Sequence, residues 1–332
     1  MSEKIHYLLH GIQDRYNALY QENIDKLGNQ DVLVASIGGS GQSFLGNILL
    51  ELGLNYADAY TEVLNPDGTN TPEPAYADYR SRLAATAKRD GHTSVPKRRW
   101  PRFVKTHLTP EFFTERPLLG AWILVRDPRD ALFSWYNFRI HFAKDPLDIR
   151  AGSFERWLDQ PGPNGVSRLE DWGNFYDQWT EARGGFERTT VTTFEDLKKA
   201  PVSSMRAALE ELGVEVPEPD LPRAVENSSF TAMRSGTANE WKSWMTPSLR
   251  TKFSAMPMSG AARRYGYRTD APAHRAHNAP GRPTPVRDRE GRTQDIRPAP
   301  VAAATASSRS AAGASVPLGS SVITRASPGR AR

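Results

Sequence analysis

Residues 31–53, DVLVASIGGSGQSFLGNILLELG, have the sequence of a buried strand, a tight loop and a helix. The apolar run at residues 32–35 is typical of a central parallel strand. Three glycines follow within the loop, and glycine allows the backbone angles that a tight turn requires. Residues 43–52 have helical spacing, and Gly53 is the kind of residue that ends a helix. This order of elements predicts an α/β domain organised around a parallel sheet.

The loop at residues 38–43, GGSGQS, also has the composition of a phosphate-binding site. A loop of this kind directs several backbone N–H groups to one spot, where the dipole of the following helix adds positive potential. An ordinary strand-to-helix turn remains the alternative for this segment taken alone. Other features of the chain must therefore decide whether the loop binds an anion.

Composition excludes several classes of site. The chain has 332 residues and no cysteine, which rules out disulfides, iron–sulfur clusters and thiolate zinc sites. Residues 271–332 contain ten arginines, no lysine and three acidic residues, so their net charge is +7. Because the net charge of the whole chain is +5, residues 1–270 have a net charge of −2. A folded part without net positive charge argues against nucleic acid as a partner. We find neither a signal peptide nor a membrane span in the sequence and expect a cytoplasmic protein.

Three parts are expected along the chain. Residues 1–30 predict a helix packed on the domain, and residues 31–270 predict the single α/β domain. Within it, the polar and proline-containing residues 54–101 are interpreted as an excursion from the sheet, with a short helix at residues 76–88. Residues 271–332 are rich in Ala, Pro, Ser and Arg without apolar periodicity, so we expect a disordered tail that folding does not require.

Further strands alternate with helices after residue 101. The expected strands are residues 102–106, 122–125 and 189–193, and the expected helices are residues 128–138, 154–159, 168–182, 195–212 and, as the last helical piece, 221–226. This alternation predicts a parallel sheet with helices on both faces and an active site beyond the carboxyl ends of the strands. His107 and Arg126 follow two of these strands directly, so we expect both to lie beside the loop.

Two groups of polar residues at this edge fit a nucleotide with two separated phosphates. The N–H groups of residues 39–43 are candidates for one phosphate. Arg126, joined by Ser134 from the following helix, is a candidate for the second. Lys105 alternates with His107 along the strand end, so both side chains are expected on the same side.

Six segments, in the same order along the chain, resemble motifs of the sulfotransferases that use 3′-phosphoadenosine-5′-phosphosulfate (PAPS). They are residues 37–45 (IGGSGQSFL), similar to the 5′-phosphosulfate loop; 102–108 (RFVKTHL), similar to the strand with the catalytic histidine; 125–136 (VRDPRDALFSWY), similar to the 3′-phosphate motif; 194–197 (FEDL); 228–233 (SSFTAM), similar to the segment that packs on the adenine; and 234–242 (RSGTANEWK). The resemblance implies a P-loop-type parallel sheet in a single domain.

The implied activity is in-line transfer of a sulfuryl group from PAPS, as co-substrate, to a hydroxyl or amine of a small-molecule acceptor. His107 would be the general base, with Lys105 and Ser134 as further catalytic residues. The implied nucleotide-binding residues are Gly39, Ser40, Gly41, Gln42, Ser43, Phe44, Arg126, Ser134, Phe194, Ser229, Phe230, Arg234, Ser235 and Gly236. No metal is expected, and the oligomeric state is left open.

Three positions depart from the family pattern: Gly39 replaces the usual loop lysine, Phe44 a tryptophan and Phe194 a tyrosine. A P-loop kinase or NTPase is an alternative, but its motif requires a lysine where Gln42 stands. A Rossmann dehydrogenase fits less well, because Phe44 occupies the position of the third glycine. The change at Gly39 also keeps open a protein that binds the nucleotide without turning it over.

Overall fold

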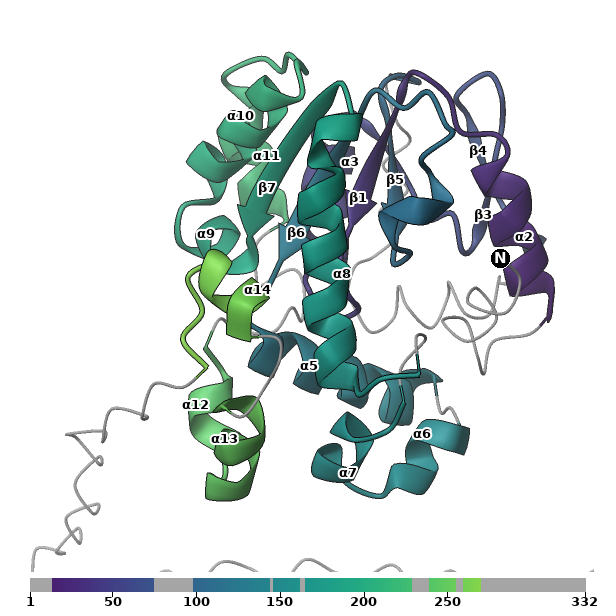
Figure 1. Ribbon diagram of the computed structural model, residues 1–332. Coiled ribbons are helices and arrows are strands. Elements are labelled where there is room, and N and C mark those ends of the chain that lie inside the picture. Colours follow the sequence, from purple (N-terminus) through teal and green to yellow (C-terminus); the bar gives the residue numbers. More distant parts are fainter. Residues whose placement is uncertain are drawn as a thin grey trace, which may run out of the picture. The chain divides into compact units, whose positions relative to one another are not determined.

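The computed structural model describes residues 14–74, 98–143, 146–161, 165–228, 239–254 and 259–269 (Figure 1). All of them belong to the first of two units, residues 1–274 and 275–332. The helix expected at residues 76–88 and the tail expected at residues 271–332 lie outside the described residues.

A parallel sheet forms the centre of the described part of the chain, with five strands in the order β2-β5-β1-β6-β7. The strands are β1 (Asp31–Ala35), β2 (Asn55–Ala57), β5 (Arg102–Thr106), β6 (Gly120–Val125) and β7 (Arg188–Thr193). In the middle of the sheet, Val34 of β1 is paired with Lys105 of β5 and with Trp122 of β6. The predicted parallel sheet is confirmed.

Alternate residues of β1 pack into two separate cores, one on each face of the sheet. Leu33 and Ala35 belong to the first core, whereas Val32 and Val34 belong to the second. Helices of the first face are α2 (Asp14–Ile24), α8 (Arg168–Ala182), which crosses the front of the sheet in Figure 1, and α14 (Ser259–Arg264). Helices of the second face are α3 (Gln42–Glu51), α10 (Pro201–Glu211) and α11 (Asp220–Asn227). The prediction of helices on both faces is confirmed.

The remaining elements connect or cover these layers. They are the antiparallel hairpin β3 (Glu62–Leu64) and β4 (Asn70–Pro72), the 3-10 helices η2 (Pro110–Phe112) and η4 (Arg183–Gly185), the π-helix η3 (Phe138–Ala143), and the α-helices α5 (Pro128–Asn137), α6 (Pro146–Ala151), α7 (Phe154–Leu158), α9 (Phe194–Lys199), α12 (Trp241–Trp244) and α13 (Pro247–Ser254).

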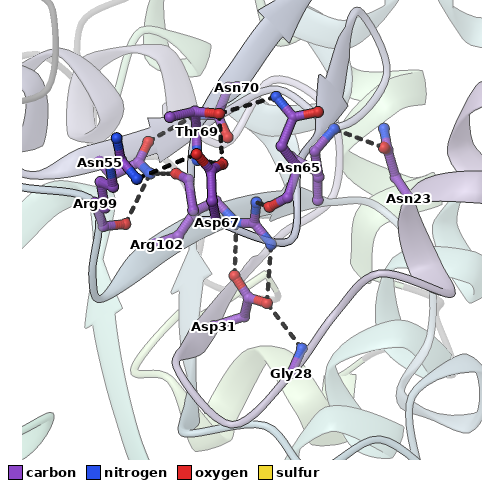
Figure 2. A network of polar contacts seen from close by, with 12 residues as sticks. Asn23, Gly28, Asp31, Asn55, Asn65, Asp67, Thr69, Asn70, Arg99 and Arg102 are labelled. Atoms are coloured by element: carbon purple, nitrogen blue, oxygen red, sulfur yellow. Dashed lines mark hydrogen bonds and ion pairs between the residues drawn. The ribbon is translucent and has the colours of Figure 1, made fainter.

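A buried ion pair joins the amino ends of β1 and β5. Arg102 donates from Nε to Asp31 Oδ1 at 2.7 Å and from Nη2 to Oδ2 at 3.1 Å, and both side chains are 0% exposed. Arg102 also donates to the Asn65 carbonyl, and the Gly28 N–H donates to Asp31. Figure 2 shows this pair at one side of a wider polar network that includes residues of the β3–β4 hairpin. The amino end of the sheet is therefore fixed by contacts that satisfy both charges.

Three details of the sequence interpretation were wrong. The single helix expected at residues 195–212 is two helices, α9 and α10, separated at Ala200 with φ −141° and ψ 62°. Pro201 explains the break, because a proline disfavours helical angles at the preceding residue. Residues 54–101 are not wholly outside the sheet, since they supply its edge strand β2. The piece near residues 221–226 is not the last helix, since α12, α13 and α14 follow it.

Candidate active site

The loop between β1 and α3 makes the tight turn that its glycines predict. Gly39 and Gly41 have φ angles of 81° and 99°, in the left-handed region that favours glycine. A Cβ atom on Gly39 would lie 2.3 Å from the carbonyl oxygen of Ala131, and one on Gly41 would lie 2.4 Å from the Phe194 ring. The loop therefore lies directly against α5 and α9, and it has no room for side chains at these two positions.

The N-terminus of α3 presents backbone donors at the carboxyl end of β1. Gly41 is the N-cap residue and makes no side-chain capping bond. The N–H groups of Gln42 and Ser43 belong to the first turn, where a helix has no internal acceptors, and the helix dipole adds positive potential there. The Ser43 side chain is exposed at the same end. These groups fit a phosphate.

Ser40 and Gln42 of the loop make hydrogen bonds within the protein. The Ser40 N–H donates to the Ile37 carbonyl at 3.3 Å, and the Ser40 hydroxyl lies 3.3 Å from the Tyr176 hydroxyl. The Gln42 side chain donates to the carbonyls of Val34 and Thr106, at 2.7 and 3.1 Å. The Ser40 N–H is therefore bonded within the loop itself, and the Gln42 amide ties α3 to the sheet.

Arg126 follows β6 and lies beside the loop. Its Nη1 donates to the Gly39 carbonyl at 2.7 Å, and its guanidinium carbon stands 4.5 Å from the centroid of the Phe194 ring. Burial lowers the pKa of Arg126, and the nearby Asp130 carboxylate opposes that effect. Ser134 of α5 also lies beside Gly39, since a Cβ atom on Gly39 would be 3.1 Å from the Ser134 Cβ. The structure thus brings Gly39, Arg126 and Ser134 together.

His107 follows β5, and its ring is held by two neighbours. Nδ1 lies 2.7 Å from the Ser36 carbonyl oxygen, and the ring stacks on Tyr60 with centroids 5.5 Å apart. Because a carbonyl only accepts, Nδ1 carries the hydrogen and Nε2 keeps its lone pair. Burial, and then the charge of Lys105, lower the pKa of His107 to about 4. The ring is therefore neutral near pH 7, with the hydrogen on Nδ1 and the lone pair on Nε2.

Lys105 lies on the same side as His107, as the alternation predicts. Its Nζ lies 5.7 Å from the centroid of the Tyr60 ring, the ring on which His107 stacks. The same Nζ is 3.1 Å from Oδ2 of Asp58, and the two side chains are 19% and 22% exposed. Asp58 follows β2, in the segment that sequence reasoning interpreted as an excursion, and no motif pointed to it.

Lys198 is a second residue that sequence reasoning missed. Its Nζ stands 4.0 Å from the centroid of the Phe44 ring and 5.3 Å from that of Phe194. Burial, and then the charge of Arg126, lower the pKa of Lys198 to about 7. Lys198 directly follows the FEDL segment, but only the packing of α9 against α3 shows that it faces Phe44.

The remaining predicted nucleotide-binding residues, Ser229, Phe230, Arg234, Ser235 and Gly236, lie outside the described residues. Within the described residues, no three or more His, Cys, Asp or Glu side chains are grouped to hold a metal ion. No helix in the same part of the chain is long and apolar enough to cross a membrane.

Residues 29–259 match the model of the family described as "Sulfotransferase domain". This match covers well over half of the chain, so the protein belongs to the sulfotransferase domain family. The matched residues include the loop, His107, Arg126 and Lys198. The family resemblance drawn from the sequence motifs is confirmed.

Curated relatives are distant and match in part. Sulfotransferase 2A2 of Rattus norvegicus is 24% identical over 182 residues, which are 47% of this chain and 62% of the relative. Sulfotransferase 1A1 of Rattus norvegicus is 27% identical over 183 residues, which are 47% of this chain and 61% of the relative. The chain thus spans about six tenths of the length of these relatives.

Solved structures of lower similarity were also found. A mouse sulfotransferase complexed with PAP has a TM-score of 0.48 at 16% identity, over 74% of this chain and 91% of that one. Retinol dehydratase in a complex with retinol and PAP has a TM-score of 0.46 at 18% identity, over 78% of this chain and 88% of that one.

Proposed function

We propose that this protein transfers a sulfuryl group from PAPS to a hydroxyl or amine of a small-molecule acceptor, with His107 as the general base. The observation that carries the proposal is the state of His107, a neutral ring whose Nδ1 faces the Ser36 carbonyl and whose Nε2 keeps a lone pair. Membership of the sulfotransferase domain family supports the same reaction class.

The residues at the carboxyl edge fit an adenosine nucleotide with two phosphates. The N–H groups at the start of α3 are suited to the 5′-phosphosulfate. Arg126 and Ser134 both lie beside Gly39, and their guanidinium and hydroxyl groups are suited to the 3′-phosphate. When bound, PAPS supplies an activated sulfuryl group.

His107 would take the proton of the acceptor oxygen or nitrogen as that atom bonds to sulfur. General base catalysis of this kind contributes about 10²–10⁴-fold to a rate. Lys105 lies two residues before His107, at the carboxyl end of β5. Its ammonium would stabilise the charge that develops on the phosphate oxygen as its bond to sulfur breaks. In the structure Lys105 contacts Asp58, so we expect this carboxylate to set the direction of the Lys105 side chain.

A nucleotide-binding protein without turnover is the second candidate, and a specific observation favours it. Gly39 takes the place of the loop lysine, and its φ of 81° and the nearby Ala131 carbonyl leave no room for a side chain. The loop therefore cannot supply a cation from this position.

One experiment separates these candidates. The protein is incubated with PAPS and a panel of phenols, alcohols and amines, and products are read by mass spectrometry for the gain of one sulfuryl group. We expect a sulfated product together with adenosine 3′,5′-bisphosphate. Tight binding of adenosine 3′,5′-bisphosphate with no sulfated product from any acceptor would favour the second candidate instead.

A further inference from the structure

Two basic side chains, Arg126 and Lys198, both lie near the aromatic ring of Phe194, beside the loop at residues 38–43. The Arg126 guanidinium carbon lies 4.5 Å from the centroid of the Phe194 ring, and the Lys198 Nζ lies 5.3 Å from the same centroid. The ring itself is 1% exposed and covers Gly41, where an added Cβ would lie 2.4 Å from it. Phe194 thus connects both cations to the loop.

Lys198 is also in contact with the helix that starts at the loop. Its Nζ lies 4.0 Å from the centroid of Phe44, a residue in the first turn of α3. Lys198 is half-buried, whereas the adjacent Lys199 is exposed. Both lysines belong to the last turn of α9, so their different surroundings follow from which side of this short helix faces α3.

An anion near both cations would be strongly stabilised at this place. Burial and repulsion by Arg126 lower the pKa of Lys198, and a phosphate within reach of the ammonium would oppose this lowering, because an opposite charge favours the protonated form. Hydrogen bonds between charged groups are also stronger when the groups are partly removed from water. Arg126 and Lys198 are each in such surroundings.

We propose that Lys198 is a further nucleotide-binding residue, which pairs with the phosphate held by Arg126 and so adds a cation beside the loop that has none at Gly39. This inference rests on the proposed function, because it takes the nucleotide to be an adenosine 3′,5′-bisphosphate.

The test compares Lys198→Met with the matched control Lys199→Met. Binding of adenosine 3′,5′-bisphosphate and of 5′-AMP is measured by titration calorimetry on the full chain. Removal of a hydrogen bond to a charged group weakens affinity about tenfold to a hundredfold. We expect this loss for the bisphosphate in Lys198→Met, a smaller loss for 5′-AMP, and no more than about a twofold change in Lys199→Met. Lys198→Arg keeps the positive charge and should keep most of the affinity.

The outcomes are distinguishable. Equal affinities of the two methionine variants for the bisphosphate would overturn the role of Lys198 and leave the proposed function standing. Equal losses for both nucleotides in Lys198→Met would also overturn it, because the 3′-phosphate would then not be the group that Lys198 contacts. A wild-type protein that binds neither nucleotide would overturn the proposed function, and the inference with it. Circular dichroism and thermal unfolding of each variant identify a general loss of structure, in which case Lys198→Arg decides.

Discussion

The two ends of the central sheet each contain a buried arginine, and they use it differently. At the amino end, Arg102 of β5 makes a bidentate ion pair with the Asp31 carboxylate of the adjacent strand β1. At the carboxyl end, Arg126 contacts the Gly39 carbonyl and the Phe194 ring, and Lys198 lies over the same ring. The comparison teaches that burial of an arginine does not define its role: Arg102 holds strands together, whereas Arg126 belongs to a group of cations around a loop.

The largest effect is expected at the amino end. Arg102→Met leaves the Asp31 carboxylate buried without its cation, and breaking a buried pair in this way costs about 3–5 kcal/mol of unfolding free energy. Urea or thermal unfolding measures this loss. The double variant Asp31→Leu with Arg102→Met removes both charges and should regain most of the stability. A single variant as stable as the wild type would show that the pair does not hold the strands.

The next effect concerns binding at the carboxyl end. Arg126→Ala should weaken binding of adenosine 3′,5′-bisphosphate tenfold or more, since a hydrogen bond to a charged group contributes about 1.5–3 kcal/mol. Binding of 5′-AMP, which lacks the 3′-phosphate, should change much less. Calorimetric titration of both nucleotides tests this, and equal losses would exclude Arg126 from the 3′-phosphate site.

A smaller effect on stability is expected at Gly39. Gly39→Lys restores the residue type of the family loop, but it places a side chain at a φ of 81° and against the Ala131 carbonyl. A non-glycine residue in this region costs about 1–3 kcal/mol. Gly184→Lys is the control, because a Cβ there meets nothing within 4 Å. If Gly39→Lys unfolds at the same urea concentration as Gly184→Lys, the loop accepts a lysine and our explanation of its absence is wrong.

The smallest expected change is in the pH profile. His107 must be neutral to accept a proton, and burial with the charge of Lys105 lowers its pKa to about 4. The neutral fraction therefore stays high from pH 7 downward and falls only as the pH drops through about 4. The value of kcat/KM for PAPS, which reports the free enzyme, should fall with a midpoint near that value. A midpoint near 6.5, the ordinary value for histidine, would contradict the buried environment.

Much of this arrangement could be predicted from the sequence. The apolar run of β1, the glycines after it and the alternation of strands and helices are local patterns, and they predict the parallel sheet and the edge at which His107 and Arg126 lie. Proximity of Gly39, Arg126 and Ser134 also follows, because consecutive parallel strands end at the same edge.

What the sequence did not reveal depends on contacts between distant segments. Asp58 meets Lys105 only because β2 joins the sheet beside β5, and a three-residue strand has too little pattern to be recognised. Lys198 meets Phe44 only because α9 packs against α3, and its neighbour Lys199 has the same sequence context. Side-chain direction in short elements is set by tertiary packing, which single-sequence patterns do not contain.

The most direct test of the central claim is the His107→Ala variant, measured for both turnover of PAPS and binding of adenosine 3′,5′-bisphosphate. Our account predicts that turnover falls by about 10²–10⁴-fold, because the base is lost, while the dissociation constant of the nucleotide stays within about twofold of wild type. Turnover of PAPS at the wild-type rate would contradict the assignment of His107 as the base and, with it, the mechanism proposed for this edge of the sheet.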